Sequence, residues 1–89
     1  MGILQLDCNE QISLANETGS SYEVISKEWG FYATPSINGR MKSYGFKTAL
    51  VINSKGQRYI MAVIEDRLTD FNEYLSATNQ KVEKWLDQL

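Results

Sequence analysis

The hydrophobic pattern of this chain is strongest at two apolar runs in its middle, Phe46 to Ile52 and Arg58 to Ile64. Each run has the length and the β-branched content of a strand, and the polar loop 53–56 lies between them. Gly56 readily takes the positive φ that closes such loops, so the pattern predicts an antiparallel hairpin. Because both runs are apolar almost continuously, we expect the C-terminal helix to cover one face of the hairpin, and a partner subunit or the N-terminal segment to cover the other.

A stripe of mostly apolar side chains recurs at intervals of three and four residues through the C-terminal third. Its members are Leu68, Phe71, Leu75, Thr78, Val82, Trp85 and Leu89. This spacing predicts one amphipathic helix over residues 68–89 that packs its stripe onto a sheet. Residues 76–79 (Ser-Ala-Thr-Asn) are weak helix formers, so a break there into two helices is the alternative.

The N-terminal third carries a weaker pattern. Residues 3–6 are compatible with a short edge strand and residues 16–21 with a polar loop, so residues 1–21 are expected to be weakly structured. From Tyr22 to Thr34, β-branched and aromatic residues favour extended structure, and Gly30 indicates a bulge or a close backbone approach. We expect one bent strand or two short strands here, as the first part of a sheet over residues 22–64.

Residues 35–45 support two interpretations. Asn38-Gly39 is a strong signal for a two-residue type I′ turn, which joins a strand near Phe31 to one near Phe46. Alternatively, Ser36 caps a short helix that Gly45 ends in the left-handed conformation. Gly39 inside so short a helix costs about 1 kcal/mol relative to alanine, so both alternatives stay open.

Together these elements place the chain in the α+β class: a small antiparallel sheet of three to five strands, packed by one C-terminal amphipathic helix, in a single domain over residues 1–89. A chain of 89 residues buries only about 60 to 65 per cent of the surface that its unfolded form exposes, so we expect marginal stability that gains from dimerisation. Antiparallel strands followed by one helix form an order of elements similar to the Whirly and PUR-type single-strand-binding modules. This topological resemblance implies dimerisation and assigns a role to no individual residue.

The residues that the chain lacks disfavour several kinds of chemistry. It has no histidine, which removes Ser-His-Asp and Cys-His pairs and histidine-based zinc sites. Its one cysteine, Cys8, cannot form an internal disulfide and lies in an acidic stretch that disfavours a reactive thiolate. We therefore expect no catalytic residues, no cofactor, no metal and a cytoplasmic location. The apolar runs are too short to span a bilayer, so no membrane partner is expected.

Charge is segregated along the sequence. Between Trp29 and Ile64 the chain carries a charge of +5 with no acidic residue, whereas the flanking segments total −7. Cations gathered on one face attract anions, and exposed aromatic rings beside them suit single-stranded nucleic acid. The tentative anion-binding or nucleic-acid-binding residues are Arg40, Lys42, Lys47, Lys55, Arg58, Trp29, Tyr32, Tyr44, Ser36 and Asn38.

The preferred hypothesis is a small non-enzymatic binding or regulatory module that acts by protein–protein association. Its partner is another protein or a further copy of the chain in a homo-oligomer, bound through an exposed sheet edge or apolar patch. The alternative is an anion-binding domain for single-stranded nucleic acid or a nucleotide. It ranks second because the sequence pI is near 5.0 and nucleic-acid-binding domains are usually basic. A carboxylate-dependent enzyme ranks third, since no acid–base pair is evident.

Overall fold

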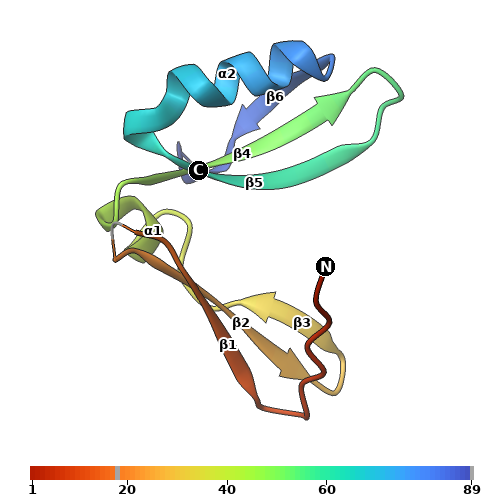
Figure 1. The fold of residues 1–89 in the computed structure, drawn as a ribbon, viewed down its shortest axis with the longest axis vertical. Coiled ribbons are helices and arrows are strands. Elements are labelled where there is room, and N and C mark those ends of the chain that lie inside the picture. The colour runs from red at the N-terminus through yellow and green to blue at the C-terminus, as the bar shows by residue number, and fades with distance from the viewer. Residues whose placement is uncertain (18, 89) are drawn as a thin grey trace. The chain divides into compact units, whose positions relative to one another are not determined.

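A computed structural model describes residues 1–17 and 19–88 of the chain. Contacts between residues divide the chain into two compact units, unit 1 over Met1–Ser36 and unit 2 over Ile37–Leu89. Among the described residues each unit contains its own three-stranded antiparallel sheet, and the helices belong to unit 2 (Figure 1). The α+β class with a small antiparallel sheet is confirmed, but the one sheet expected over residues 22–64 is wrong, because those strands belong to two separate sheets. A single domain requires the two units to fold cooperatively, and it stays a prediction.

Unit 1 is a sheet with the strand order β1-β2-β3. Strand β1 (Gln11–Ala15) pairs with β2 (Ser21–Lys27), and β2 pairs with β3 (Gly30–Ala33) across a tight turn at residues 28 and 29. The alternative of two short strands within residues 22–34 is therefore confirmed. They form a hairpin, with Gly30 at its first position after the turn.

The strand expected at residues 3–6 is wrong. Ile3 and Leu4 are 94% and 70% exposed and belong to no strand, whereas Ile12 and Leu14 of β1 pair with β2. The alternation of apolar and polar residues in β1 fits a sheet with two different faces, and residues 3–6 lack that alternation. Thr18, in the predicted loop 16–21, lies outside the described residues.

One face of the unit 1 sheet is apolar. Ile12 pairs with Val24 and Leu14 with Tyr22, while Phe31 and Ala33 of β3 are on the same face by register. Apart from Pro35, no apolar side chain in the described part of unit 1 is buried. Leu14 and Phe31 are 55% and 69% exposed. The three strands thus present an apolar face without a buried hydrophobic core of their own.

Unit 2 is built on β4 (Phe46–Asn53), which lies between β5 (Arg58–Ile64) and β6 (Gln80–Trp85). The predicted hairpin is confirmed as β4 and β5, antiparallel and in register from Phe46↔Ile64 to Ile52↔Arg58. Gly56 in its loop has a φ of 80°.

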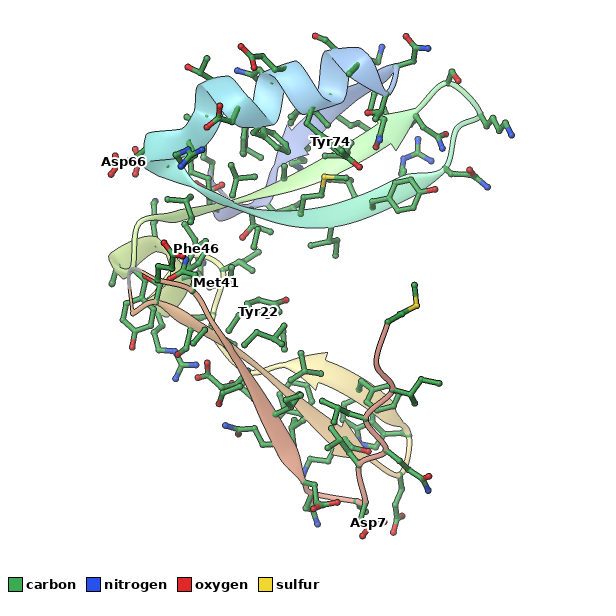
Figure 2. All side chains as sticks on the ribbon, viewed as in Figure 1. Asp7, Tyr22, Met41, Phe46, Asp66 and Tyr74 are labelled. Carbon is green, nitrogen blue, oxygen red and sulfur yellow. The ribbon has the colours of Figure 1, made fainter. Side chains whose placement is uncertain are left out.

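Before β4, residues 35–45 contain a short helix, α1 (Arg40–Ser43), and not a hairpin. Its N-cap is Gly39, without a side-chain cap, and not the expected Ser36. Gly45 has a φ of 82° just after the helix, as the helical alternative predicts. Met41 of α1, labelled in Figure 2, is buried. Its sulfur accepts a hydrogen bond from the Thr48 hydroxyl of β4 at 3.9 Å.

The C-terminal helix is shorter than predicted. Helix α2 spans Leu68–Ala77, preceded by the 3-10 turn η1 (Glu65–Arg67) and followed by β6 and the 3-10 turn η2 (Leu86–Gln88). The predicted helix over 68–89 is therefore wrong beyond Ala77, and the chain lacks the strands-then-helix order of the single-strand-binding modules. Asn79, with a φ of 55°, ends the helix in the left-handed conformation. Leu89 lies outside the described residues.

A bulge in β6 explains why the sequence predicts a helix where the structure has a strand. Val51 pairs with Val82 and Ala49 pairs with Trp85, so Glu83 is an extra residue between two otherwise regular stretches of the ladder. The bulge lets Val82 and Trp85, three residues apart, face the same side of a strand. That spacing is the one typical of a helix.

Helix α2 covers one face of this sheet and forms the hydrophobic core of unit 2 (Figure 1). Ala49 and Val51 are 0% exposed and Leu75 of α2 is 4% exposed. Residues that pack against them are Met61, Phe71, Val82 and Trp85. The ring centroids of Phe71 and Trp85 are 6.1 Å apart, in a tilted arrangement favourable to aromatic pairs. The predicted packing of the helix onto the sheet is confirmed.

This core predicts that alanine substitutions at two neighbouring positions of α2 change the free energy of unfolding by very different amounts. Leu75→Ala should lower the free energy of unfolding by about 2 to 5 kcal/mol, because it leaves a cavity against Ala49 and Val51. Ser76→Ala, at an exposed position, should change it by no more than about 0.5 kcal/mol. Urea denaturation at one fixed protein concentration measures both. Equal effects would show that α2 does not pack on β4 as described.

Candidate functional site

Strand β5 lies at an edge of the unit 2 sheet, because the strand order is β5-β4-β6. It is seven residues long, with the sequence Arg-Tyr-Ile-Met-Ala-Val-Ile. After Arg58 it contains no charged residue, no proline and no glycine. Tyr59 and Ile60 are 44% and 67% exposed. An edge strand of this composition presents unpaired backbone groups and apolar side chains together.

Hydrogen bonds at the two ends of the β4–β5 hairpin show which backbone groups of β5 point away from β4. The Asn53 amide donates to the Gln57 carbonyl at 3.0 Å, and the Glu65 amide donates to the Gly45 carbonyl at 2.8 Å. Hydrogen-bonded pairs alternate along an antiparallel ladder, so the odd-numbered residues of β5 direct their N–H and C=O groups toward β4. Residues 58, 60, 62 and 64 therefore direct theirs outward, and no backbone partner for them occurs among the described residues.

A shallow apolar groove of about 460 Å³ runs beside this edge, between β5 and α2. Met61 and Val63 form its floor on the sheet, and Phe71 and Tyr74 line it from the helix. Figure 2 shows the labelled Tyr74 between α2 and the sheet. Arg67 and Asp70, joined by a salt bridge, lie at its polar end. The edge thus combines backbone hydrogen-bonding groups with an adjoining apolar surface for side chains.

The other edge of the same sheet has a different character. Strand β6 has the sequence Gln-Lys-Val-Glu-Lys-Trp, with Lys81, Glu83 and Lys84 exposed and a bulge at Glu83. Charges and bulges are the features by which natural edge strands avoid further pairing. In unit 1 the edge strands β1 and β3 have five and four residues. Strand β5 is therefore the longest of the described edges, and after Arg58 it has neither a charge nor a bulge.

The predicted anion site depends on uncompensated cations, and two of them are paired with carboxylates from the C-terminal segment. The Lys47 ammonium lies 4.0 Å from an oxygen of the buried Asp87 and 4.8 Å from the centre of the Trp85 ring. Asp87 also accepts a hydrogen bond from the Thr48 amide at 3.2 Å. Lys47 thus holds η2 against β4, which is a structural role.

Arg58 is paired in the same manner. Its Nε and Nη2 atoms donate to the two oxygens of Glu83 at 2.6 and 3.0 Å, a bidentate salt bridge between β5 and β6. This hydrogen bonding is the main cause that lowers the pKa of Glu83 and raises the pKa of Arg58. Desolvation opposes both shifts, and the charges of Arg58 and Lys81 add to the lowering at Glu83.

The remaining candidates of unit 2 lie around the two ends of β4. Arg40 and Lys42 are on α1 and Tyr44 follows it, while Lys55 is in the loop before β5. Lys47 and Ile52, the partner of Arg58, are about 17 Å apart along the strand. Asn38 precedes α1, too early to contribute to a helical N-cap. The five cations therefore do not form one carboxylate-free surface on unit 2.

The other three candidates belong to unit 1. Trp29 and Tyr32 form a stacked pair with ring centroids 5.7 Å apart and are 72% and 43% exposed, and Ser36 is the last residue of the unit. Unit 1 has five acidic residues and one lysine, a net charge of −4. The Lys27 ammonium donates to the Asn9 side chain at 2.7 Å. The rings that would stack on bases thus lie on an acidic unit, and a role for any of these ten residues in anion binding stays a prediction.

Metal-binding clusters are absent from the described part of the chain, which includes no group of three or more His, Cys, Asp or Glu side chains that could hold a metal ion. None of the helices described is long and apolar enough to cross a membrane.

Apart from Arg58, the residues of the β5 edge are missing from the predicted site. The hypothesis of an exposed sheet edge did not specify which strand supplies it. The signal is the run from Tyr59 to Ile64, six residues without a charge. From its composition alone this run predicts a strand covered on both faces. A central strand and an unprotected edge strand have the same composition, and the pairing of β6 with β4 decides between them.

Comparison of the chain with known proteins finds no matching family model, no similar curated protein and no similar solved structure.

The Arg58–Glu83 salt bridge predicts a specific pH dependence. Because the pKa of Glu83 is lower in the folded than in the unfolded state, its stabilising contribution is present above the unfolded pKa and is lost as the pH falls through the folded value. Arg58→Gln should return the pKa of Glu83 toward its ordinary value, as measured by NMR titration of the side-chain carboxyl carbon. Lys42→Gln removes the same charge on α1 and should leave this pKa unchanged. A normal pKa in the unmodified protein would contradict the bridge.

Proposed function

We propose that this protein is a small non-enzymatic module that acts by protein–protein association, through capture of an extended segment at the β5 edge. The single observation that carries the proposal is the outward set of backbone groups at residues 58, 60, 62 and 64, on a strand without edge protection. Addition of a strand to such an edge is a common mode of recognition, in which main-chain hydrogen bonds supply affinity.

The groove beside β5 supports the same function. In strand addition, alternate side chains of the incoming segment fit pockets next to the edge and provide specificity. Side chains on one face of a segment paired with β5 meet the apolar groove of Met61, Phe71 and Tyr74. Those on the other face lie beside Ile60, which is 67% exposed. An apolar segment with one face toward α2 therefore suits this surface best.

Unit 1 adds a second reason to expect association. The sheet of β1, β2 and β3 has an apolar face, yet Pro35 is its one buried apolar residue among those described. A small sheet needs a covered hydrophobic face to be stable. Exposed apolar surface of this kind is typical of interaction sites.

The proposal of a non-enzymatic role rests on the chemistry of the side chains. The sequence contains no histidine, and Cys8 is exposed near the N-terminus. The pKa shifts of Arg58 and Glu83 arise from their mutual salt bridge, which is a structural cause and not a catalytic one. No observation favours the anion-binding alternative over association, since Lys47 and Arg58 are paired with carboxylates.

Site-specific photo-crosslinking tests this function. A photoreactive phenylalanine analogue at Ile60 should form adducts with a polypeptide in extract of the cells that naturally produce the protein, and peptide mapping should locate the crosslink in an extended apolar segment. The same analogue at Ser54, in the exposed β4–β5 loop, is the matched control. Ala62→Lys, added to the protein that carries the analogue at position 60, places a charge on the edge. It should reduce the adducts at least about tenfold.

Two results would contradict the proposal. One is equal adduct formation from positions 60 and 54, and the other is adduct formation at position 60 that survives Ala62→Lys. Far-UV circular dichroism of each protein establishes that the sheet is intact. Ala62 is exposed, and its backbone N–H does not bond to β4, so the substitution should leave the fold unchanged.

A further inference from the structure

We infer that the segment captured by β5 is the β5 strand of a second copy of this chain, paired antiparallel about a two-fold axis through Met61. This inference rests on the proposed function and adds the identity of the partner. It joins two three-stranded sheets into one six-stranded sheet with the order β6-β4-β5-β5-β4-β6.

The backbone geometry selects this register. A two-fold axis perpendicular to the sheet pairs residue i with a residue of the same face, and complete overlap of two strands spanning Arg58–Ile64 places the axis at Met61. Ile60 then lies opposite Ala62 of the second copy, and Arg58 opposite Ile64. These are the residues whose N–H and C=O groups point outward, so each such pair can exchange both hydrogen bonds. Met61 lies opposite itself in a pair without hydrogen bonds.

The side chains agree with this register. Ile60 is large and faces the small Ala62, a complementary pairing of the kind that fills space between strands. Tyr59 lies opposite Val63 on the face toward α2, and an aromatic residue beside a β-branched one is a favourable cross-strand pair. Arg58 is the one charged residue of the strand and lies opposite Ile64, next to the acidic Glu65. No like charges face one another.

The two-fold axis also brings both apolar surfaces together. Because it is perpendicular to the sheet, both α2 helices lie on the same face of the joined sheet. The grooves lined by Met61, Phe71 and Tyr74 then face one another across the seam, where each can be closed by the other copy. A second copy thus covers the exposed parts of Tyr59 and Tyr74 together with the backbone edge.

Closure at two copies is the strongest reason to choose this partner. After β5 pairs with β5, the remaining edges of the joined sheet are both β6, with its bulge and exposed Lys81, Glu83 and Lys84. These features oppose further strand addition, so the unit 2 sheet ends as a closed dimer and not as a fibre. A symmetric dimer of this kind requires one open edge and one protected edge in each sheet, and β5 and β6 provide them.

A cysteine scan over the seam tests this inference. In a Cys8→Ser background, Met61→Cys places two thiols on residues whose Cα atoms are about 4.5 Å apart, within the range for a disulfide. Oxidation should convert most of this protein to a covalent dimer. Ile60→Cys and Ala62→Cys place their thiols diagonally across the seam, too far apart for efficient bonding. Each should form at least about tenfold less dimer. Lys81→Cys, on the β6 edge, should stay monomeric under the same oxidation.

Sedimentation of the unmodified protein over a range of concentrations provides the independent measurement. We expect a monomer–dimer equilibrium that Ala62→Lys weakens at least about tenfold and Ser54→Lys leaves unchanged. A monomer at all concentrations overturns the inference. So does a dimer that forms disulfides through Lys81→Cys, or through Ile60→Cys in preference to Met61→Cys. Adducts at position 60 with a different protein, combined with a monomeric chain, retain the proposed function and eliminate the second copy as partner.

Discussion

The fold of unit 2 depends on the burial of β4 beneath α2. Ala49 and Val51 are fully buried because the helix lies directly over them, and this position of the helix determines the path of the chain on either side. Strands β5 and β6 are both antiparallel to β4 and hence parallel to one another, so β5, α2 and β6 form a crossover connection. The crossover carries the chain over β4 to its far side. Strand β5 is left at an edge as a direct consequence.

The local part of this architecture could be predicted from the sequence. The hairpin of β4 and β5 needs two apolar runs and a loop with Gly56, all within twenty residues, and the first half of the C-terminal periodicity is a helix. Strand β6 could not be recognised in this way. Its bulge at Glu83 gives Val82 and Trp85 the spacing of a helix face, while their actual partners, Val51 and Ala49, lie more than thirty residues away in the sequence. Asn79 was the available signal, as a residue that ends a helix as readily as it starts one.

Strand β6 also changes how the charge pattern is interpreted. The acid-free segment predicts a positive surface only if the C-terminal acids lie on a separate helix. Pairing of β6 with β4 brings Glu83 to Arg58, and η2 brings Asp87 to Lys47. For two of the five cations, segregation of charge along the sequence thus reflects which elements are neighbours: the β4–β5 hairpin supplies Lys47 and Arg58, and the C-terminal segment supplies their partners. Linear charge patterns indicate a ligand surface only when the pairing of the elements is known.

Binding of a partner and stability of the fold are connected in this chain. Unit 1 has 36 residues, and chains below about 40 residues usually need additional support to fold alone. Burial of the apolar face of unit 1 removes apolar groups from water. Pairing of the β5 edge gives hydrogen-bond partners to its backbone groups. A partner that binds only the folded chain raises the free energy of unfolding in proportion to the logarithm of its concentration. For a small α+β chain with one modest core, contained in unit 2, binding through an open edge therefore contributes to the fold as well as to recognition.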